Sequence, residues 1–140
     1  MICDAKVIEL MVEVKIWSGY YSSRDCQRHP NALFVFGDNL AKHGYAGQAT
    51  IRDESNAFGV PTCIAPRNAF SDNSYEDNCQ RLEKVLLKLS RTSAQYDFVY
   101  FPYCGLGTGL AMLATRAPKT CQYLNRRLEE LFGVKNGQKV

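Results

Sequence analysis

The sequence predicts one three-layer α/β/α domain over residues 1–140, in which helices flank a central sheet that is mixed or mostly parallel. Two observations support this fold class. Apolar runs typical of buried strands, 32–36 and 98–101, alternate along the chain with two segments of helical periodicity, 74–89 and 118–132. Each of these runs is followed directly by a polar loop that contains glycines. The length also suits a single hydrophobic core, since domains of roughly 100–150 residues are the commonest.

The N-terminal part is expected to form one strand and a long connection. Residues 8–17 alternate between apolar and mostly charged positions, which is typical of a half-exposed strand near a sheet edge. The polar segment 18–31 is long for a bare loop, so we expect it either to be functional or to contain a short helix. Its Tyr20, Tyr21 and Arg24 could clamp a nucleotide or could pack the loop onto the surface.

The segment 32–53 is the first candidate ligand site. After the apolar run, a polar turn is expected at Gly37, Asp38 and Asn39, and a helix is expected to start after Gly44 and Gly47. In α/β proteins, ligands bind beyond the carboxyl ends of strands, where helix N-termini attract anions and glycines let the backbone approach a phosphate. The alternative is a strand, a turn and a helix cap with no ligand.

The middle of the chain is expected to add a strand and a helix. Residues 55–59 suit a turn, 60–65 a short apolar strand with Pro61 near its start, and 66–74 a loop. Ser74 and Asp77 resemble a capping box that opens a helix. The apolar stripe of this helix consists of Tyr75, Cys79, Leu82, Val85, Leu86 and Leu89.

The loop after a strand over 96–102 is the second candidate ligand site. Three alternating glycines occur within Gly105, Leu106, Gly107, Thr108 and Gly109. Their spacing matches neither the dinucleotide-binding fingerprint nor the P-loop, but backbone N–H groups in such a loop can cradle a diphosphate. If the strands 32–36 and 96–102 are neighbours, both loops open at the same sheet edge and would close on one elongated ligand.

A last helix is expected from Pro118 to Gly133, which suit the first turn and the stop of a helix. Its apolar stripe consists of Cys121, Leu124, Leu128, Leu131 and Phe132. The polar tail 134–140 is expected to be flexible.

Composition narrows the function classes. The net charge of +3 is too small to indicate nucleic-acid binding by itself. No apolar run is long enough for a transmembrane helix and the N-terminus lacks a secretory signal, so we expect a cytoplasmic protein with no membrane partner. The six cysteines and two histidines show no metal-binding or disulfide spacing. We therefore expect six free thiols, no metal and no cofactor.

Three motifs carry a resemblance to a known family: Phe34-Val-Phe-Gly-Asp-Asn-Leu, His43-Gly-x-x-Gly-Gln-Ala and Gly105-Leu-Gly-Thr-Gly-Leu-Ala. Over residues 32–132 the chain resembles the macrodomain-like superfamily of ADP-ribose-binding proteins, in particular a branch of small bacterial and phage proteins. The resemblance implies a macrodomain-like α/β/α fold. It also implies that Asn39 contacts the ribose distal to adenine, and that Gly44, Gly47 and the loop 105–109 lie beside the diphosphate.

The chain departs from the family pattern in two places. Gly37 and Asp38 replace the usual Ala-Ala pair before the last asparagine, and the glycine turn is reduced to Gly-x-x-Gly. The adenine-binding aspartate of the family has only Asp25 as a candidate match. Because the family contains both hydrolases and pure binders, the fold alone does not imply an activity.

Few side chains offer chemistry. Asp38 could position or deprotonate a water while Asn39 holds ribose hydroxyls, although Asp38 could instead cap the following turn. His43 could act as a general acid, could contact a phosphate, or could simply be an exposed loop histidine. Gln48 is included in the candidate binding site, or else satisfies local hydrogen bonds. Cys104 is taken as a small buried thiol, since no base lies near it in sequence.

Three function classes follow. The first is binding of ADP-ribose or a related NAD-derived nucleotide, with hydrolysis of ADP-ribosylated protein or nucleic acid or of ADP-ribose phosphate. The second is a non-catalytic reader or sequestering protein for the same ligand. The third is a nucleic-acid-associated protein that uses Arg24, Lys42, Arg52 and Arg67, a class that the low net charge weakens.

Overall fold

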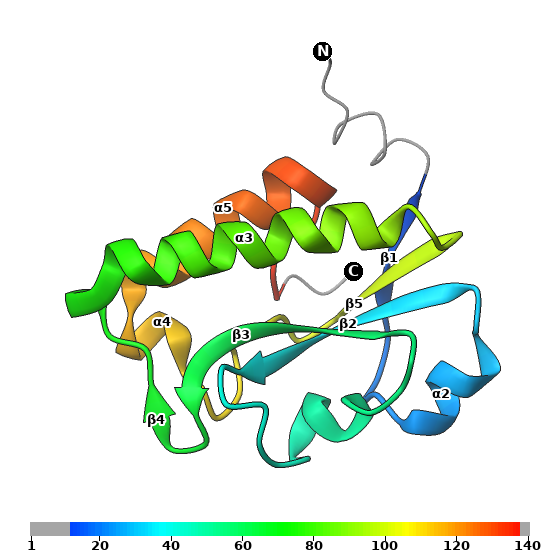
Figure 1. The fold of residues 1–140 in the computed structure, drawn as a ribbon, viewed down its shortest axis with the longest axis horizontal. Helices are drawn as coiled ribbons and strands as arrows, with labels where there is room; N and C mark the ends of the chain where they lie inside the picture. The colour runs from blue at the N-terminus through cyan, green and yellow to red at the C-terminus, as the bar shows by residue number, and fades with distance from the viewer. Residues whose placement is uncertain (1–11, 138–140) are drawn as a thin grey trace.

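A five-stranded mixed sheet forms the centre of the computed structural model, which describes residues 12–137. Its strands are β1 (Glu13–Trp17), β2 (Ala32–Asn39), β3 (Ala57–Ala65), β4 (Asn68–Ala69) and β5 (Phe98–Pro102). Their order is β1-β5-β2-β3-β4, and only β4 runs antiparallel to its neighbour (Figure 1). The predicted α/β class with a mixed central sheet is therefore confirmed.

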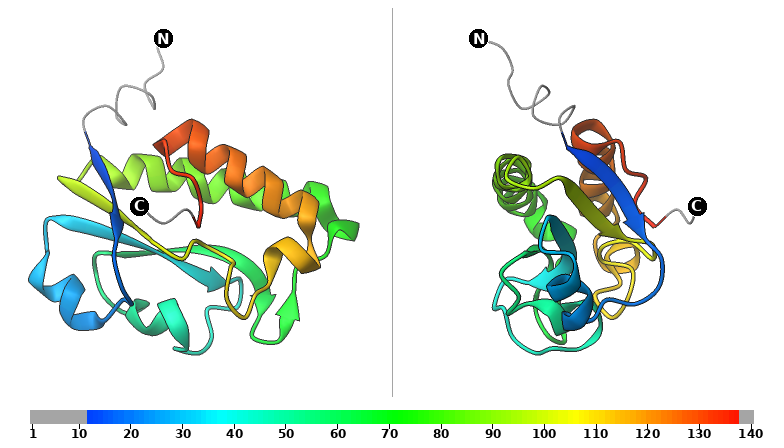
Figure 2. Two further views of the ribbon diagram at one scale, coloured as in Figure 1. Left: turned by 180° about the vertical axis from the view of Figure 1, so that it is seen from behind. Right: turned by 90° about the vertical axis from the view of Figure 1, so that its right-hand side faces the viewer.

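Helices lie on both faces of the sheet. The long helices α3 (Tyr75–Ser93) and α5 (Pro118–Phe132) pack side by side on one face. The opposite face carries two short elements, α2 (Ser23–Arg28) and the 3₁₀ helix η1 (Gly47–Ile51), so the second helical layer is thin (Figure 2). Two further short elements, η2 (Asp72–Ser74) and α4 (Leu113–Arg116), precede α3 and α5 in the chain.

The two layers bury separate hydrophobic clusters. Leu33 and Val35 of β2 point toward α3 and α5, where Leu86 and Leu128 belong to the larger cluster. Phe34 and its alternate neighbours point to the other face and join the smaller cluster under α2 and η1. Because β2 is buried on both faces, its apolar run is continuous rather than alternating.

Several predicted elements are confirmed. Strand β5 and helix α5 lie within two residues of their expected bounds, and Gly133 ends α5 in the left-handed conformation at φ 68°. Helix α3 starts within one residue of the expected position but continues to Ser93, beyond the expected stripe over 74–89. The segment 18–31 does contain a short helix, α2. The predicted first strand is observed from Glu13, and its residues 8–11 lie outside the described part of the chain.

Other expectations were wrong. The turn expected at Gly37, Asp38 and Asn39 is strand, because these residues pair with Val60, Pro61 and Cys63 of β3. Strand β3 also starts earlier than expected, at residue 57, which replaces the predicted turn over 55–59. Pairing with a neighbouring strand thus overrides the turn preference of a Gly-Asp-Asn sequence.

The helix starts also differ from expectation. The helix expected after the first glycines is only the five-residue 3₁₀ turn η1, too short to present a helix dipole. Ser74 precedes α3 but its side chain makes no capping hydrogen bond, so the predicted capping box is not formed.

The first part of the C-terminal tail is packed. Val134 is buried, and the side chain of Asn136 hydrogen-bonds to both backbone groups of Leu106. The expectation that the tail is flexible from residue 134 onward was therefore wrong for Val134 and Asn136. Among the helices formed by residues 12–137, none combines the length and apolar character needed to cross a membrane.

Candidate functional site

The two glycine loops lie side by side at the carboxyl edge of the sheet. Strands β2 and β5 pair in parallel, through Ala32 with Phe98 and Phe34 with Tyr100. The segments that follow them, 40–46 and 103–112, therefore open in the same direction. A Cβ on Gly37 would lie 3.7 Å from the backbone nitrogen of Gly107, which shows how closely the second loop approaches the end of β2.

The side chain of Gln48 bridges the two loops. Its Oε1 accepts a hydrogen bond of 2.8 Å from the backbone N–H of Gly37. Its Nε2 donates to the carbonyl oxygen of Gly105 at 2.9 Å and lies 3.2 Å from Sγ of Cys104. Gln48 therefore does more than satisfy local hydrogen bonds, because it sets the distance between the end of β2 and the second loop.

Asp38 is held in an ion pair rather than left free. Its two oxygens accept hydrogen bonds from Nε and Nη2 of Arg52, and Oδ1 also accepts from the backbone N–H of Asn39. Arg52 in addition donates to the carbonyl oxygens of His43 and Gly44. Three of the roughly four acceptor sites of this carboxylate are therefore occupied, and its side chain is buried, so a water has little access to Asp38 as a general base.

Asn39 shapes the turn that leads to the first glycine. Its Nδ2 donates to the carbonyl oxygen of His43 at 2.9 Å, and its Oδ1 accepts from the N–H of His43 at 3.2 Å. The His43 side chain is exposed, as are Gly44 and Gly47. The two glycines have φ of 82° and 60°, values that favour glycine over other residues.

The second loop depends on glycine at two positions. Gly105 and Gly107 have φ of 91° and 78°, and a Cβ on Gly107 would meet Cβ of Leu113 at 3.0 Å. Gly109, in contrast, has open space around the position of a Cβ. Leu106 is only 1% exposed, so its side chain belongs to the core and offers a ligand at most its backbone.

Backbone N–H groups in the second loop remain available for a ligand. Within residues 12–137, the N–H groups of Gly107, Thr108 and Gly109 donate to no other group. The hydroxyl of Thr108 instead points back into its own loop, donating to the carbonyl oxygens of Cys104 at 2.6 Å and Gly105 at 3.2 Å. Successive free N–H groups next to glycines in the left-handed region form a concavity suited to an anion.

The loops at this edge are free of acidic residues and rich in exposed apolar side chains. Segments 18–22, 40–46, 66–67 and 103–112 contain Lys42, His43 and Arg67 but no aspartate or glutamate. The exposed large hydrophobic side chains of residues 12–137 all lie at or beyond the carboxyl ends of parallel strands; they are Tyr20, Tyr45, Ile64, Leu110 and Met112. The edge could therefore receive an anion with an apolar or aromatic portion.

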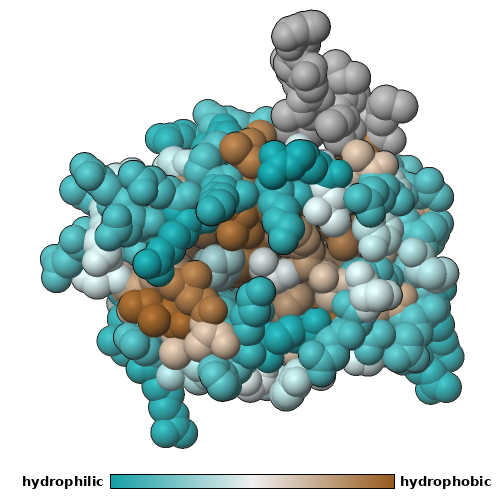
Figure 3. Space-filling view, viewed as in Figure 1, coloured by the Kyte–Doolittle hydropathy of each residue, from teal (hydrophilic) through white to brown (hydrophobic). Residues whose placement is uncertain are grey.

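On the face drawn in Figure 3, hydrophilic side chains cover most of the surface and hydrophobic ones show in patches between them. The largest patch lies at lower left, where Figure 1 has α4, β3 and β4. Ile64, on β3, and Met112, just before α4, are among the exposed apolar side chains of that region.

The two tyrosines of segment 18–31 have different roles, because Tyr21 is buried and Tyr20 is exposed. The hydroxyl of Tyr21 donates to the carbonyl oxygens of Val35 and Tyr100, so this side chain packs the segment onto the sheet. Burial raises the pKa of Tyr21 well above its ordinary value. Asp25, the candidate adenine contact, lies in the first turn of α2, where its N–H donates to the capping hydroxyl of Ser22 and its carboxylate accepts from that hydroxyl. Tyr20, at 88% exposed, is the one of the two rings that could meet a ligand.

The thiols of residues 12–137 form neither disulfides nor a metal-binding cluster. Five cysteines of the described chain are free thiols, and Cys3 lies outside it. Burial raises the pKa of Cys26 to about 12, which keeps this thiol protonated and unreactive. Within residues 12–137, no group of three or more histidine, cysteine or acidic side chains is arranged to hold a metal ion.

Residues 16–127 match the model of one protein family, described as a family of unknown function, DUF7831. The match covers well over half of the 140 residues. The chain belongs to the DUF7831 family. Comparisons with curated proteins and with solved structures gave no match. The DUF7831 match includes both glycine loops, Gln48 and Arg52, and it ends before Asn136.

Two residues that contact the loops were not assigned to the site from sequence. Arg52 was considered only as one of four cations that could contact nucleic acid, and Asn136 lies in the tail beyond the DUF7831 match. Neither has a local sequence signal, because each acts on a segment at least eight residues away.

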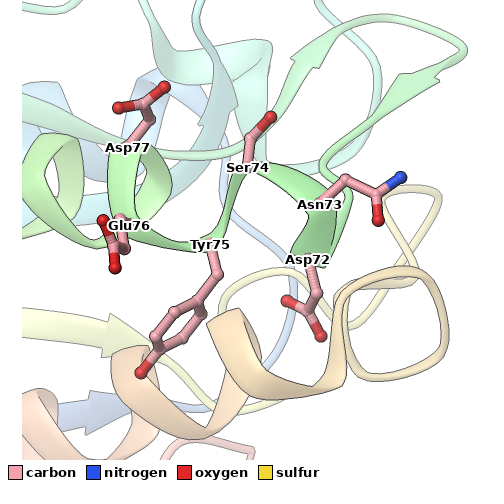
Figure 4. Close-up of a pocket in the computed structure, with 6 residues that line it drawn as sticks. All are labelled: Asp72, Asn73, Ser74, Tyr75, Glu76 and Asp77. Carbon is pink, nitrogen blue, oxygen red and sulfur yellow. The ribbon is translucent and has the colours of Figure 1, made fainter.

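A hollow of about 400 Å³ lies elsewhere, at the start of α3, and is lined by residues 72–77 (Figure 4). None of the glycine-loop residues lines it. Asp72, one of its members, caps α5 by accepting hydrogen bonds from the N–H groups of Lys119 and Thr120. This hollow is acidic and so suits an anionic ligand poorly.

Proposed function

We propose that this protein binds ADP-ribose or a related NAD-derived nucleotide between its two glycine loops. The observation that carries the proposal is the bridge through Gln48, which holds the end of β2 and the second loop together beside the free N–H groups of Gly107, Thr108 and Gly109. A diphosphate accepts hydrogen bonds from such groups without needing a metal or a cationic side chain.

The surroundings of the loops also favour a nucleotide. The loop segments themselves contain no acidic residue, which limits repulsion of the phosphates although Asp53 bonds to Tyr45 of the first loop. Lys42 and Arg67 add positive charge at the same edge. The exposed side chains of Tyr45 and Leu110 offer apolar surface for a base or ribose. The motif resemblance to macrodomain-like proteins, described above, points to the same ligand.

The contacts of Asp38 favour binding over hydrolysis. A general base must lie within hydrogen-bond reach of the water that it deprotonates, but Asp38 is buried, and three of its roughly four acceptor sites already accept from Arg52 and from the N–H of Asn39. We therefore propose a reader or sequestering role. The check is release of ADP-ribose from a modified protein or nucleic acid, or of phosphate from ADP-ribose phosphate, neither of which should exceed the background rate.

Titration calorimetry tests the ligand class. ADP-ribose should bind more tightly than AMP, NAD or a short RNA, because it combines a diphosphate for the free N–H groups of the second loop with the free distal ribose that the resemblance assigns to Asn39. Tighter binding of the RNA than of ADP-ribose would favour the nucleic-acid class instead. Absence of binding for all four compounds would reject the proposal.

A further inference from the structure

The peptide group between Gly105 and Leu106 is held from both sides by carboxamide side chains. Its carbonyl oxygen, on Gly105, accepts a hydrogen bond of 2.9 Å from Nε2 of Gln48. Its N–H, on Leu106, donates to Oδ1 of Asn136 at 2.7 Å. We call this pair of side chains the clamp: Gln48 lies on η1, directly after the first glycine loop, and Asn136 lies in the C-terminal segment.

Asn136 is itself fixed in place. Its Nδ2 donates to the carbonyl oxygen of Leu106 at 3.0 Å and to Oδ1 of Asn125 on α5 at 2.9 Å. The side chain thus pairs with both backbone groups of Leu106, as a neighbouring strand would. The anchor on α5 connects this pairing to the core of the domain.

The backbone of the C-terminal segment packs directly against the second loop. A Cβ on Gly105 would lie 2.7 Å from the backbone nitrogen of Gly137 and 3.1 Å from Oδ1 of Asn136. Glycine at 105 is therefore required by close contact as well as by its φ of 91°. The C-terminal residues 136–137 are in this sense part of the loop.

We infer that Asn136 is a positioning residue of the ligand loop, which together with Gln48 fixes the Gly105–Leu106 peptide and so orients the N–H groups that follow it. This inference rests on the proposed function for its ligand. With both ends of the peptide hydrogen-bonded, the group cannot rotate to turn the Gly105 carbonyl toward an anion. The loop is then ordered before the ligand arrives, which avoids an entropic cost of ordering it on binding.

The clamp is tested without any ligand by amide hydrogen exchange. The Leu106 N–H should be protected in the wild-type protein, and Asn136→Ala should speed its exchange by about tenfold or more. Asn136→Asp keeps an oxygen that can accept from the Leu106 N–H but replaces the donor Nδ2 with an oxygen facing the Leu106 carbonyl, so it should restore only part of the protection. Asn73→Ala makes the same chemical change at an exposed position away from the loop and should leave the exchange of Leu106 unchanged. Unchanged exchange in Asn136→Ala would overturn the clamp.

Binding then tests the positioning role. Asn136→Ala should weaken ADP-ribose binding by about tenfold through the disordered loop. Glu83→Gln, which removes a contact between α3 and α5 and touches neither loop, should lower stability but not affinity. Faster exchange with undiminished affinity would show that the clamp does not serve the ligand and would overturn the positioning role. If the wild type binds no nucleotide, the proposed function fails, and the exchange measurement still decides the clamp.

Discussion

Asp38 and Arg52 form a bidentate ion pair that joins the end of β2 to the residue after η1. Nη2 of Arg52 lies 2.5 Å from Oδ1 of Asp38, and Nε lies 3.1 Å from Oδ2. The side chains are only 11% exposed for Arg52 and 6% for Asp38. The hydrogen bond to Asp38 raises the pKa of Arg52 above its ordinary value, so the guanidinium stays charged. The pair thus joins the two ends of the first glycine loop, and Arg52 also hydrogen-bonds to carbonyl oxygens within that loop.

Replacing Arg52 by alanine should destabilise the fold. The substitution leaves a buried carboxylate without its partner, so we expect the free energy of unfolding to fall by about 3 kcal/mol. Urea denaturation measures this change. Arg24→Ala is the matched control, because Arg24 is exposed and makes no hydrogen bond or ion pair with residues 12–137. Equal stability of the two variants would show that the ion pair does not support the loop.

Stability should depend on pH through Glu83. Its carboxylate accepts hydrogen bonds from Arg127 and Tyr123, both on α5. The bond from Arg127 lowers the pKa of Glu83 below its ordinary value of 4.5, despite the opposing effect of burial. A pKa that is lower in the folded than in the unfolded state stabilises the fold above the unfolded value, and this contribution is lost as pH falls through the folded pKa.

The stability advantage of the wild type over Glu83→Gln should therefore be full at neutral pH and should shrink below about pH 4.5. Urea denaturation across that pH range measures it. Glu76→Gln, at an exposed position on the same helix, is the control and should differ little from the wild type at any pH. An advantage that stays constant down to pH 3 would contradict the role given to Glu83.

The cysteines should all be reduced. Thiol titration of freshly denatured protein without reductant should detect all six cysteines. In the native protein, Cys26 should react slowest, since it is buried and its pKa is raised to about 12. A lower count after denaturation would show a disulfide and would contradict the assignment of free thiols.

A charge at Gly109 should block the ligand. Gly107 lies closer to the end of β2, but any side chain there would collide with Leu113 and disturb the fold. Gly109 has open space, so Gly109→Glu should fold normally and place a negative charge beside the expected diphosphate. We expect ADP-ribose affinity to fall by about tenfold or more, measured by calorimetry.

Gly109→Gln is the matched control for that variant, because it has the same size without the charge. It should keep most of the affinity. Equal binding by Gly109→Glu and the wild type would place the ligand away from the second loop, and equal loss in both variants would point to a steric effect rather than to repulsion of an anion.

Hydrophobic periodicity was a sound guide to the long elements. The stripes of α3 and α5 and the run in β5 are confirmed, because burial of one helix face or of both strand faces requires those patterns. The turn expected at Gly37 was wrong because pairing with Val60 of β3 extends the strand. Local preference carries no information about that pairing.

The organisation of the candidate site was predicted in part. The two glycine loops and their common edge follow from strand runs that each end in a glycine-bearing segment. The roles of Gln48, Arg52 and Asn136 do not follow from sequence, because each side chain reaches a backbone group that only the folded chain brings near. Likewise, the sequence does not show that the Asp38 side chain is buried, because only the folded chain brings Arg52 beside it.

Backbone amide NMR during an ADP-ribose titration tests the central claim most directly. If the nucleotide binds between the glycine loops, the amide signals of Gly107, Thr108 and Gly109 should shift most, together with those of residues 44–48. Signals from residues 72–77, which line the acidic hollow, should not move and serve as the internal control. Saturating ADP-ribose that leaves the loop signals unchanged, or shifts only those of the hollow, would contradict the account.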